Sequence, residues 1–168
     1  MQKIFSILAV IICTTFSGYA QEKSKQAASP KAFVKTSNVS ITYCQPSKRG
    51  REIFGGLVPY GQVWRTGANE ATEITFKKEC NFGGQTIKPG TYTLFTIPGE
   101  NEWTIIINGQ LKQWGSFDYE KYKDKDIAQF KVPVKHIKDV VEKFTISASG
   151  NDMKMEWDNV SVSVPMKF

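Results

Sequence analysis

The stretch KPGTYTLFTIPGENEWTIIIN, residues 88–108, decides the fold. Its two runs, 91–97 and 103–107, are rich in β-branched and aromatic residues, which favour strands. A Pro-Gly pair stands before the first run and another stands between the two, and such pairs mark turns. The pattern therefore predicts two strands, each launched from a tight turn.

Alternation of apolar and polar residues recurs on both sides of this stretch. Residues 39–43 read VSITY, which predicts a strand with one buried face. Further strands are expected at 71–77, 128–134 and 143–149, and FGGQ at 82–85 is expected to be a hairpin, because glycines accept the positive φ that such turns require.

In the last segment, the apolar residues of the alternating pattern move from odd to even positions. Met153, Met155 and Trp157 occupy odd positions, whereas Val160, Val162 and Val164 occupy even ones. Such a slip moves every side chain to the other face, so Asp158-Asn159 is either a hairpin turn or a bulge. The bulge is favoured because Asp-Asn lacks the glycine that type I′ turns prefer.

Two irregular stretches, 45–67 and 111–126, interrupt the strands, and no long amphipathic helix pattern occurs. Many short strands bounded by turns indicate an antiparallel sandwich or barrel. We predict an all-β fold, an antiparallel β-sandwich with two long loops and little helix.

The N-terminus has the features of a secretory signal peptide. Lys3 supplies a positive charge, residues 4–14 form an apolar run, and small residues precede the expected cleavage after Ala20. This leaves a flexible lead-in at 21–29 and a single β-sandwich domain at 30–168. The apolar run is shorter than the roughly 20 residues that a spanning helix needs, so no membrane span is expected after cleavage. The chain is predicted to be periplasmic or secreted.

The net charge, the cysteines and the single histidine limit which partners, metals and cofactors can be expected. The formal net charge is +6, but no dense basic run concentrates it, so no nucleic-acid partner is expected. Cys44 and Cys80 remain after the expected cleavage and form either a disulfide or two buried free thiols. With one histidine, His136, and no C-x-x-C pair, neither a metal nor a cofactor is expected.

The sequence offers little for catalysis. It contains no G-x-S-x-G elbow and no glycine-rich phosphate loop before a helix. A serine or cysteine nucleophile would have to use His136 as its base, and His136 is expected to be exposed at a strand end. Catalytic residues are left unassigned.

The most unusual composition is KRGREIFGGLVPYGQVWRTGANEAT at 48–72, which holds all three arginines of the chain. Arginine forks bind carboxylates, sulfates or phosphates, and aromatic rings stack on sugars or cations. Trp114, in the second irregular stretch, adds an aromatic platform. The candidate ligand-binding residues are Arg49, Arg51, Tyr60, Trp64, Arg65, Asn69, Glu70 and Trp114.

An architectural role for the same residues is the alternative. An Arg65–Glu70 pair could tie the stretch to the sheet, and Trp64 could plug the core. Trp103 and Trp157 fall in strand patterns and are expected in the core.

Three segments carry a resemblance to a known family: residues 43–72, which end in VWRTGANEAT, then KPGTYTLFTIPGENEWTIIIN, then WGSFDY. They resemble the family catalogued as domain of unknown function 2911, over about 29–168. The resemblance implies an exported bacterial domain with a β-sandwich fold, and it brings no established activity, cofactor or catalytic residue. Cys44 stands where the motif usually has serine, so a Cys44–Cys80 bridge would be peculiar to a subset.

Three functions follow from these observations. The leading hypothesis is a non-catalytic binding module for an anionic or carbohydrate-like ligand, a small molecule or a glycan. The second is a hydrolase of unfamiliar type with Glu70 as acid or base and Arg65 stabilising negative charge, which requires Glu70 to be buried near Arg65 in an open cleft. The third is a structural or assembly module with a protein partner in the cell envelope.

Overall fold

The computed structural model describes residues 28–168. The predicted signal peptide, its cleavage after Ala20 and all but the end of the 21–29 lead-in lie outside the described residues. No helix in the described part is both long and apolar enough to cross a membrane. The elements are β1 (Lys31–Lys35), β2 (Val39–Cys44), β3 (Thr72–Phe76), β4 (Cys80–Phe82), β5 (Gln85–Ile87), β6 (Gly90–Ile97), β7 (Glu102–Asn108), the 3-10 helix η1 (Tyr119–Lys125), β8 (Asp126–Ala148) and β9 (Asp152–Lys167).

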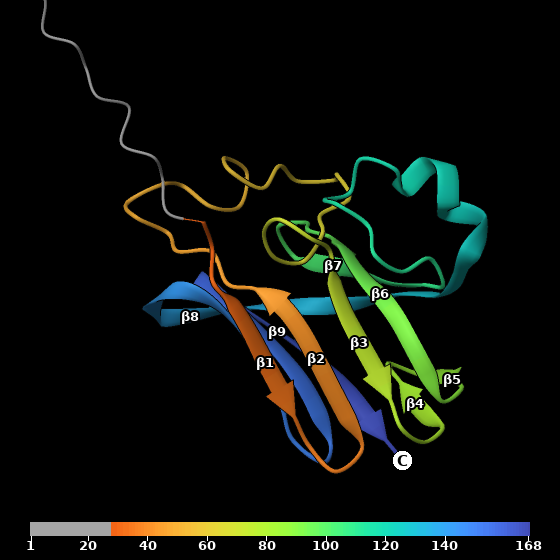
Figure 1. The fold of residues 1–168 in the computed structure, drawn as a ribbon. Coiled ribbons are helices and arrows are strands. Elements are labelled where there is room, and N and C mark those ends of the chain that lie inside the picture. The colour runs from red at the N-terminus through yellow and green to blue at the C-terminus, as the bar shows by residue number, and fades with distance from the viewer. Residues whose placement is uncertain (1–27) are drawn as a thin grey trace, which may run out of the picture.

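The strands form one nine-stranded sheet in the order β1-β2-β3-β6-β7-β8-β9-β4-β5, and every neighbouring pair is antiparallel (Figure 1). The all-β antiparallel class predicted from the sequence is confirmed, with a single continuous strand order, and the sandwich stays a prediction. The Gly83-Gly84 hairpin is also confirmed, since both glycines have positive φ between β4 and β5.

The long strand β8 holds the two halves of the sheet together. Its 23 residues join the predicted strands 128–134 and 143–149, the first part pairing with β7 and the second with β9. Its register is irregular between His136 and Thr145, and His136 is exposed. Buried residues from strands on both sides of β8, with Trp103 and Trp157 among them, belong to one hydrophobic core.

The predicted phase change in the last segment is a bulge within a continuous strand. Asp158 has φ +54 in the middle of β9. The odd-numbered apolar residues before it and the even-numbered ones after it are all buried, so the bulge keeps both sets on the core side.

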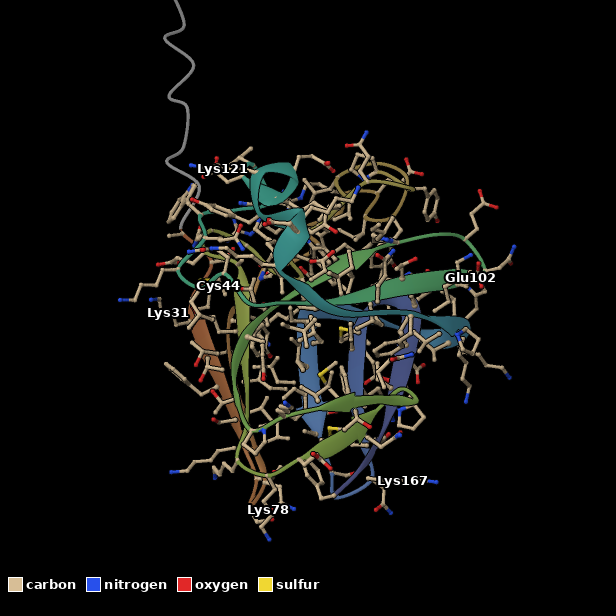
Figure 2. The ribbon with its side chains drawn as sticks, turned by 90° about the vertical axis from the view of Figure 1, so that its right-hand side faces the viewer. Lys31, Cys44, Lys78, Glu102, Lys121 and Lys167 are labelled. Atoms are coloured by element: carbon tan, nitrogen blue, oxygen red, sulfur yellow. The ribbon has the colours of Figure 1, made fainter. Side chains whose placement is uncertain are left out.

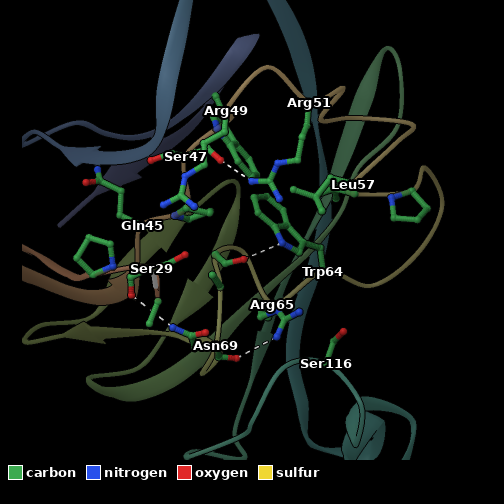
Figure 3. A pocket seen from close by; sticks show the side chains of 18 of the residues that line it. Ser29, Gln45, Ser47, Arg49, Arg51, Leu57, Trp64, Arg65, Asn69 and Ser116 are labelled. Atoms are coloured by element: carbon green, nitrogen blue, oxygen red, sulfur yellow. Dashed lines mark hydrogen bonds between the residues drawn. The ribbon is translucent and has the colours of Figure 1, made fainter. Parts of the chain in front are cut away.

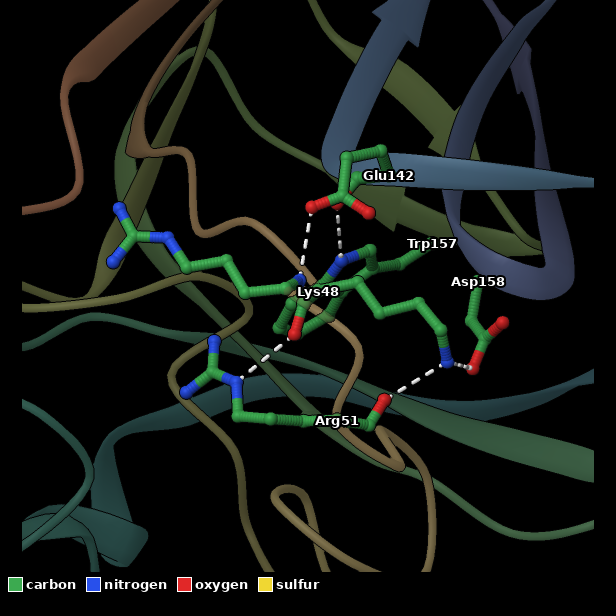
Figure 4. Close-up of polar contacts among 6 residues, drawn as sticks. Lys48, Arg51, Glu142, Trp157 and Asp158 are labelled. Atoms are coloured by element: carbon green, nitrogen blue, oxygen red, sulfur yellow. Dashed lines mark hydrogen bonds and ion pairs between the residues drawn. The ribbon is translucent and has the colours of Figure 1, made fainter.

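Two long connections, as predicted, lie at the same end of the sheet: loop 1 (residues 45–71) and loop 2 (residues 109–125) (Figure 1). Loop 1 is tied to the β8–β9 ribbon, where Lys48 pairs with Asp158 and also donates to the Arg51 carbonyl at 2.8 Å (Figure 4). Loop 2 is tied down by Asp126, which accepts hydrogen bonds from the Tyr119 hydroxyl at 2.7 Å and from the Asn108 amide at 2.8 Å.

The two described cysteines are buried free thiols, the second of the two alternatives that the sequence left open. Cys44 ends β2 beside the loops. Cys80 opens β4, just after Lys78, which Figure 2 places at the far end of the sheet from Cys44. A disulfide needs Cα atoms within about 7 Å, and a six-residue strand such as β2 spans more than twice that length.

Candidate functional site

A cavity of about 440 Å³ lies under loop 1 and is called the arginine cavity below (Figure 3). Five of the predicted ligand-binding residues line it: Arg49, Arg51, Trp64, Arg65 and Asn69. Its volume is in the range of small-molecule sites, which is about 300–1,000 Å³. In Figure 3, Arg49 and Arg51 enter from one side and Arg65 lies beside Asn69 on the other.

Loop 1 orients two of these arginines, Arg51 and Arg65, through its own backbone. Arg51 donates from Nε to the Lys48 carbonyl at 3.0 Å and from Nη2 to the Ser47 carbonyl at 2.6 Å. Arg65 donates from Nη1 to the Asn69 carbonyl at 3.1 Å and lies over the Phe117 ring. Each guanidinium therefore keeps N–H groups for a ligand while its position is held.

Backbone conformation also shapes the cavity wall. Arg49 and Asn69 both have positive φ, which few residues other than glycine and asparagine adopt readily. The strained backbone at Arg49 is held by a hydrogen bond from its N–H to the Glu142 carboxylate at 2.9 Å. Asn69 in turn donates from its side-chain amide to the Ser29 carbonyl at 3.4 Å.

The charge in the arginine cavity is of one sign. No aspartate or glutamate is among its lining residues within the described part of the chain, and none of the three arginines forms an ion pair there. Burial lowers the pKa of Arg65 from its ordinary value, but an arginine stays protonated at any physiological pH. The cavity thus has a positive potential that favours anions.

The floor of the cavity is aromatic but mostly covered. Trp64 is buried, stacks on Trp157 with ring planes 17° apart, and donates its indole N–H to the Gly67 carbonyl at 3.0 Å. Of its two predicted roles, Trp64 therefore fills the core, and only part of its surface meets the cavity.

Three predicted residues lie outside this cavity. Tyr60 is exposed on loop 1, its ring close to Gly55, and desolvation together with Glu100 and Glu52 raises its pKa. Glu70 and Trp114 line a second cleft of about 340 Å³, called the Glu70 cleft below. Its described lining is Lys31, Thr42, Tyr43, Cys44, Glu70, Ala71, Glu73, Lys112, Gln113 and Trp114.

The position of Glu70 overturns the geometry that the hydrolase hypothesis requires. Its side chain is 45% exposed and pairs with Lys31 at 3.3 Å, and no Arg65–Glu70 ion pair occurs among the described residues. A hydrogen bond from its own backbone N–H and one from the Cys44 thiol lower the pKa of Glu70, so it is a carboxylate at neutral pH and a poor proton donor.

Cys44 is no substitute nucleophile. Its thiol donates to Glu70 Oε2 at 3.3 Å, and burial together with this acceptor raises its pKa. The reactive thiolate is therefore suppressed. The described residues also contain no group of three or more metal-ligating side chains that could hold an ion.

The model of the family described as "Protein of unknown function (DUF2911)" matches residues 24–166. The chain belongs to the DUF2911 family. This confirms the family expected from the VWRTGANEAT stretch. No curated protein and no solved structure matches the chain.

Sequence reasoning missed part of the lining of the arginine cavity in this DUF2911 protein. The residues that it did not single out share small or amide side chains, and those lining the arginine cavity include Ser29, Gln45, Ser47, Gln62 and Ser116. Gln45 and Ser47 directly follow the predicted strand at 39–43, so their place at the loop end of the sheet was a usable signal. Ser29 and Ser116 come from other segments, and no local pattern marks them.

Proposed function

We propose that this protein is an exported, non-catalytic binding domain for a small organic anion, held in the arginine cavity. The observation that carries the proposal is three arginines lining one cavity of about 440 Å³ with no carboxylate among its described lining residues. Arg49 is exposed and Arg51 and Arg65 are half-buried, so their like charges repel across the cavity and attract a counter-charge. A bound anion supplies that charge.

The held guanidinium groups suit carboxylate, sulfate or phosphate. Their planar forks bind such groups through two parallel hydrogen bonds. Arg51 and Arg65 are already fixed by loop 1, so little side-chain entropy is lost when a ligand binds. The cavity is also larger than an inorganic phosphate, which favours an anion with an organic body.

A neutral sugar fits the cavity less well. Sugar binding uses exposed aromatic faces, but Trp64 and Trp157 are buried and stacked on each other. Neutral glycans therefore serve as the contrasting probes in the test below.

The test is a titration of the chain without residues 1–20, by thermal shift and calorimetry, with sugar phosphates, uronic acids, dicarboxylates and neutral oligosaccharides. A ligand at about 100 times its Kd adds roughly 2.7 kcal/mol of stability, which is readily measured. We expect anions to stabilise the protein and Arg65→Ala to abolish the effect. Arg65→Lys should restore only part of it, because lysine keeps the charge and loses the fork.

The matched control is Lys78→Ala, which removes one positive charge at the opposite end of the sheet (Figure 2). Binding should be unchanged in this variant. Equal stabilisation by neutral oligosaccharides, or equal loss in Lys78→Ala and Arg65→Ala, would contradict a specific anion site.

Export is part of the proposal and rests on the N-terminal signal features. We expect protein recovered from the periplasm or the medium to begin at Gln21, as read by N-terminal sequencing. Recovery of a chain that still begins at Met1 from the cytoplasm alone would refute it.

A further inference from the structure

The Glu70 cleft lies next to the arginine cavity but is chemically different from it. The two sites share three segments, in which consecutive residues line one and then the other: Pro30 and Lys31, Gln45 and Cys44, Asn69 and Glu70. The Glu70 cleft, unlike its neighbour, contains carboxylates and no arginine.

One buried polar atom in the Glu70 cleft has no partner. Gln113 is 7% exposed, and its Oε1 is the one buried side-chain polar atom of the described residues without a hydrogen bond. Its Nε2 donates to the Gln110 carbonyl at 2.9 Å and to Asn108 Oδ1 at 3.4 Å, which determines which end of the amide is the oxygen. A buried acceptor without a partner is costly, so this oxygen calls for a donor.

Of the other lining groups, Glu73 and Trp114 have the same preference, whereas Lys31 and Lys112 are cations. Glu73 Oε1 accepts a hydrogen bond from the Lys112 backbone N–H at 3.0 Å, but Glu73 forms no ion pair within the described residues. Trp114 is 60% exposed, and the cation–π contacts found in the described part involve Phe117 and Tyr122 instead. An uncovered indole beside two carboxylates favours an organic cation.

The Lys31–Glu70 ion pair shows that Glu70 binds an ammonium group in this position. The Lys31 ammonium group lies 3.3 Å from Glu70 Oε1, and the two side chains are 58% and 45% exposed. Such an exposed pair contributes little to stability, so a ligand ammonium could replace it at small cost. The Cys44 thiol meanwhile holds the other carboxylate oxygen at 3.3 Å, which keeps Glu70 at the cleft.

We propose that the Glu70 cleft binds the ammonium group of a small primary amine or amino acid, through Glu70, Glu73 and Gln113 Oε1, with Trp114 covering the organic part. An ammonium has three N–H donors, enough for one hydrogen bond to each of the three. This site is distinct from the anion site of the proposed function and does not depend on it.

The test is a two-dimensional NMR titration of the chain without residues 1–20. The probes are phenylethylamine, phenylalanine and N-acetyl-phenylethylamine, the last being the same molecule without a charge. We expect the first two to move the Gln113 side-chain amide and the Trp114 indole signals, the latter identified with Trp114→Phe. Tighter binding of phenylalanine would assign the site to amino acids, and tighter binding of phenylethylamine would assign it to simple amines.

Two variants change the affinity in opposite directions. Glu73→Gln should weaken binding about tenfold, because a charge-assisted hydrogen bond is lost, and its amide oxygen can still accept from the Lys112 N–H. Lys31→Ala should strengthen binding, because it removes the competing ammonium. Glu79→Gln, at an exposed glutamate outside the cleft, is the matched control.

Equal shifts with the uncharged N-acetyl probe would overturn the proposal, since the charge would then play no part. So would the absence of any shift at Gln113 and Trp114 up to the solubility of both amines, because Gln113 Oε1 would then have water as its partner. Failure of the anion titration with success here would refute the proposed function and leave this site standing.

Discussion

The hairpin glycines Gly83 and Gly84 differ in what surrounds them, although both have positive φ. A Cβ on Gly83 would lie 2.0 Å from Phe130 Cε2, whereas a Cβ on Gly84 would meet nothing within 4 Å. Gly84→Ala should cost about 1–2 kcal/mol from its left-handed backbone alone. Gly83→Ala should cost a further 1–3 kcal/mol or so, because Phe130 must move. Urea denaturation of both variants checks that Gly83→Ala costs more stability than Gly84→Ala, and equal costs would contradict this prediction.

Asp152 makes the free energy of unfolding depend on pH in the acid range. A hydrogen bond from the Ser149 hydroxyl, supported by Ser163, lowers the pKa of Asp152 below its ordinary 3.8. Its stabilising effect is therefore present above about pH 4 and is lost as the pH falls through the folded-state pKa. Asp152→Asn should cost at most about 1 kcal/mol at neutral pH, since the site is largely screened by solvent.

The difference between Asp152→Asn and the native protein should shrink toward zero as the pH is lowered below 4 or so, measured by urea midpoints. Asp124→Asn, at an exposed position of loop 2, is the control and should follow the native protein throughout. If the stability difference between Asp152→Asn and the native protein grew in acid, the folded state would raise the pKa of Asp152 instead of lowering it.

The bulge of β9 and loop 1 are joined by the Lys48–Asp158 pair (Figure 4). Its side chains are 20% and 18% exposed, against 65% and 52% for Lys131–Glu102. Asp158→Asn should cost about 1–3 kcal/mol, because Lys48 loses a poorly solvated counter-charge, and asparagine still tolerates the positive φ. Glu102→Gln should cost less than about 1 kcal/mol. Chemical denaturation of both acid-to-amide variants compares them directly.

Elements were predictable where a periodic pattern exists. The strand at 39–43 and the bulge at Asp158 follow from alternation, because one buried face requires it. The strands at 91–97 and 103–107 follow from their β-branched and aromatic residues between turns. The union of two predicted strands into β8 was not predictable. Its middle, around His136–Val141, pairs irregularly and lies at the surface, so no burial pattern marks it as strand.

The site was only partly predictable for a reason that belongs to the whole molecule. The linear stretch that holds Arg65, Asn69 and Glu70 suggested one site. In the structure, Asn69 lines the arginine cavity and its neighbour Glu70 lines the Glu70 cleft. Asn69 has positive φ, so the backbone bends there, and sequence alone does not say what lies on each side of such a bend. Loop 2 supplies the second side through Gln113 and Trp114.

Covalent connectivity is also a property of the whole molecule. With Cys44 and Cys80 at opposite ends of the sheet, no disulfide can form without unfolding. The chain without residues 1–20 should therefore release two thiols on unfolding without reductant, and none quickly while folded, because both are buried and burial raises the pKa of each. Reductant should leave the urea midpoint unchanged. Thiol titration and intact mass check both points, and a mass lower by two hydrogens, with no free thiol in urea, would show a bridge and a different arrangement of β2 and β4.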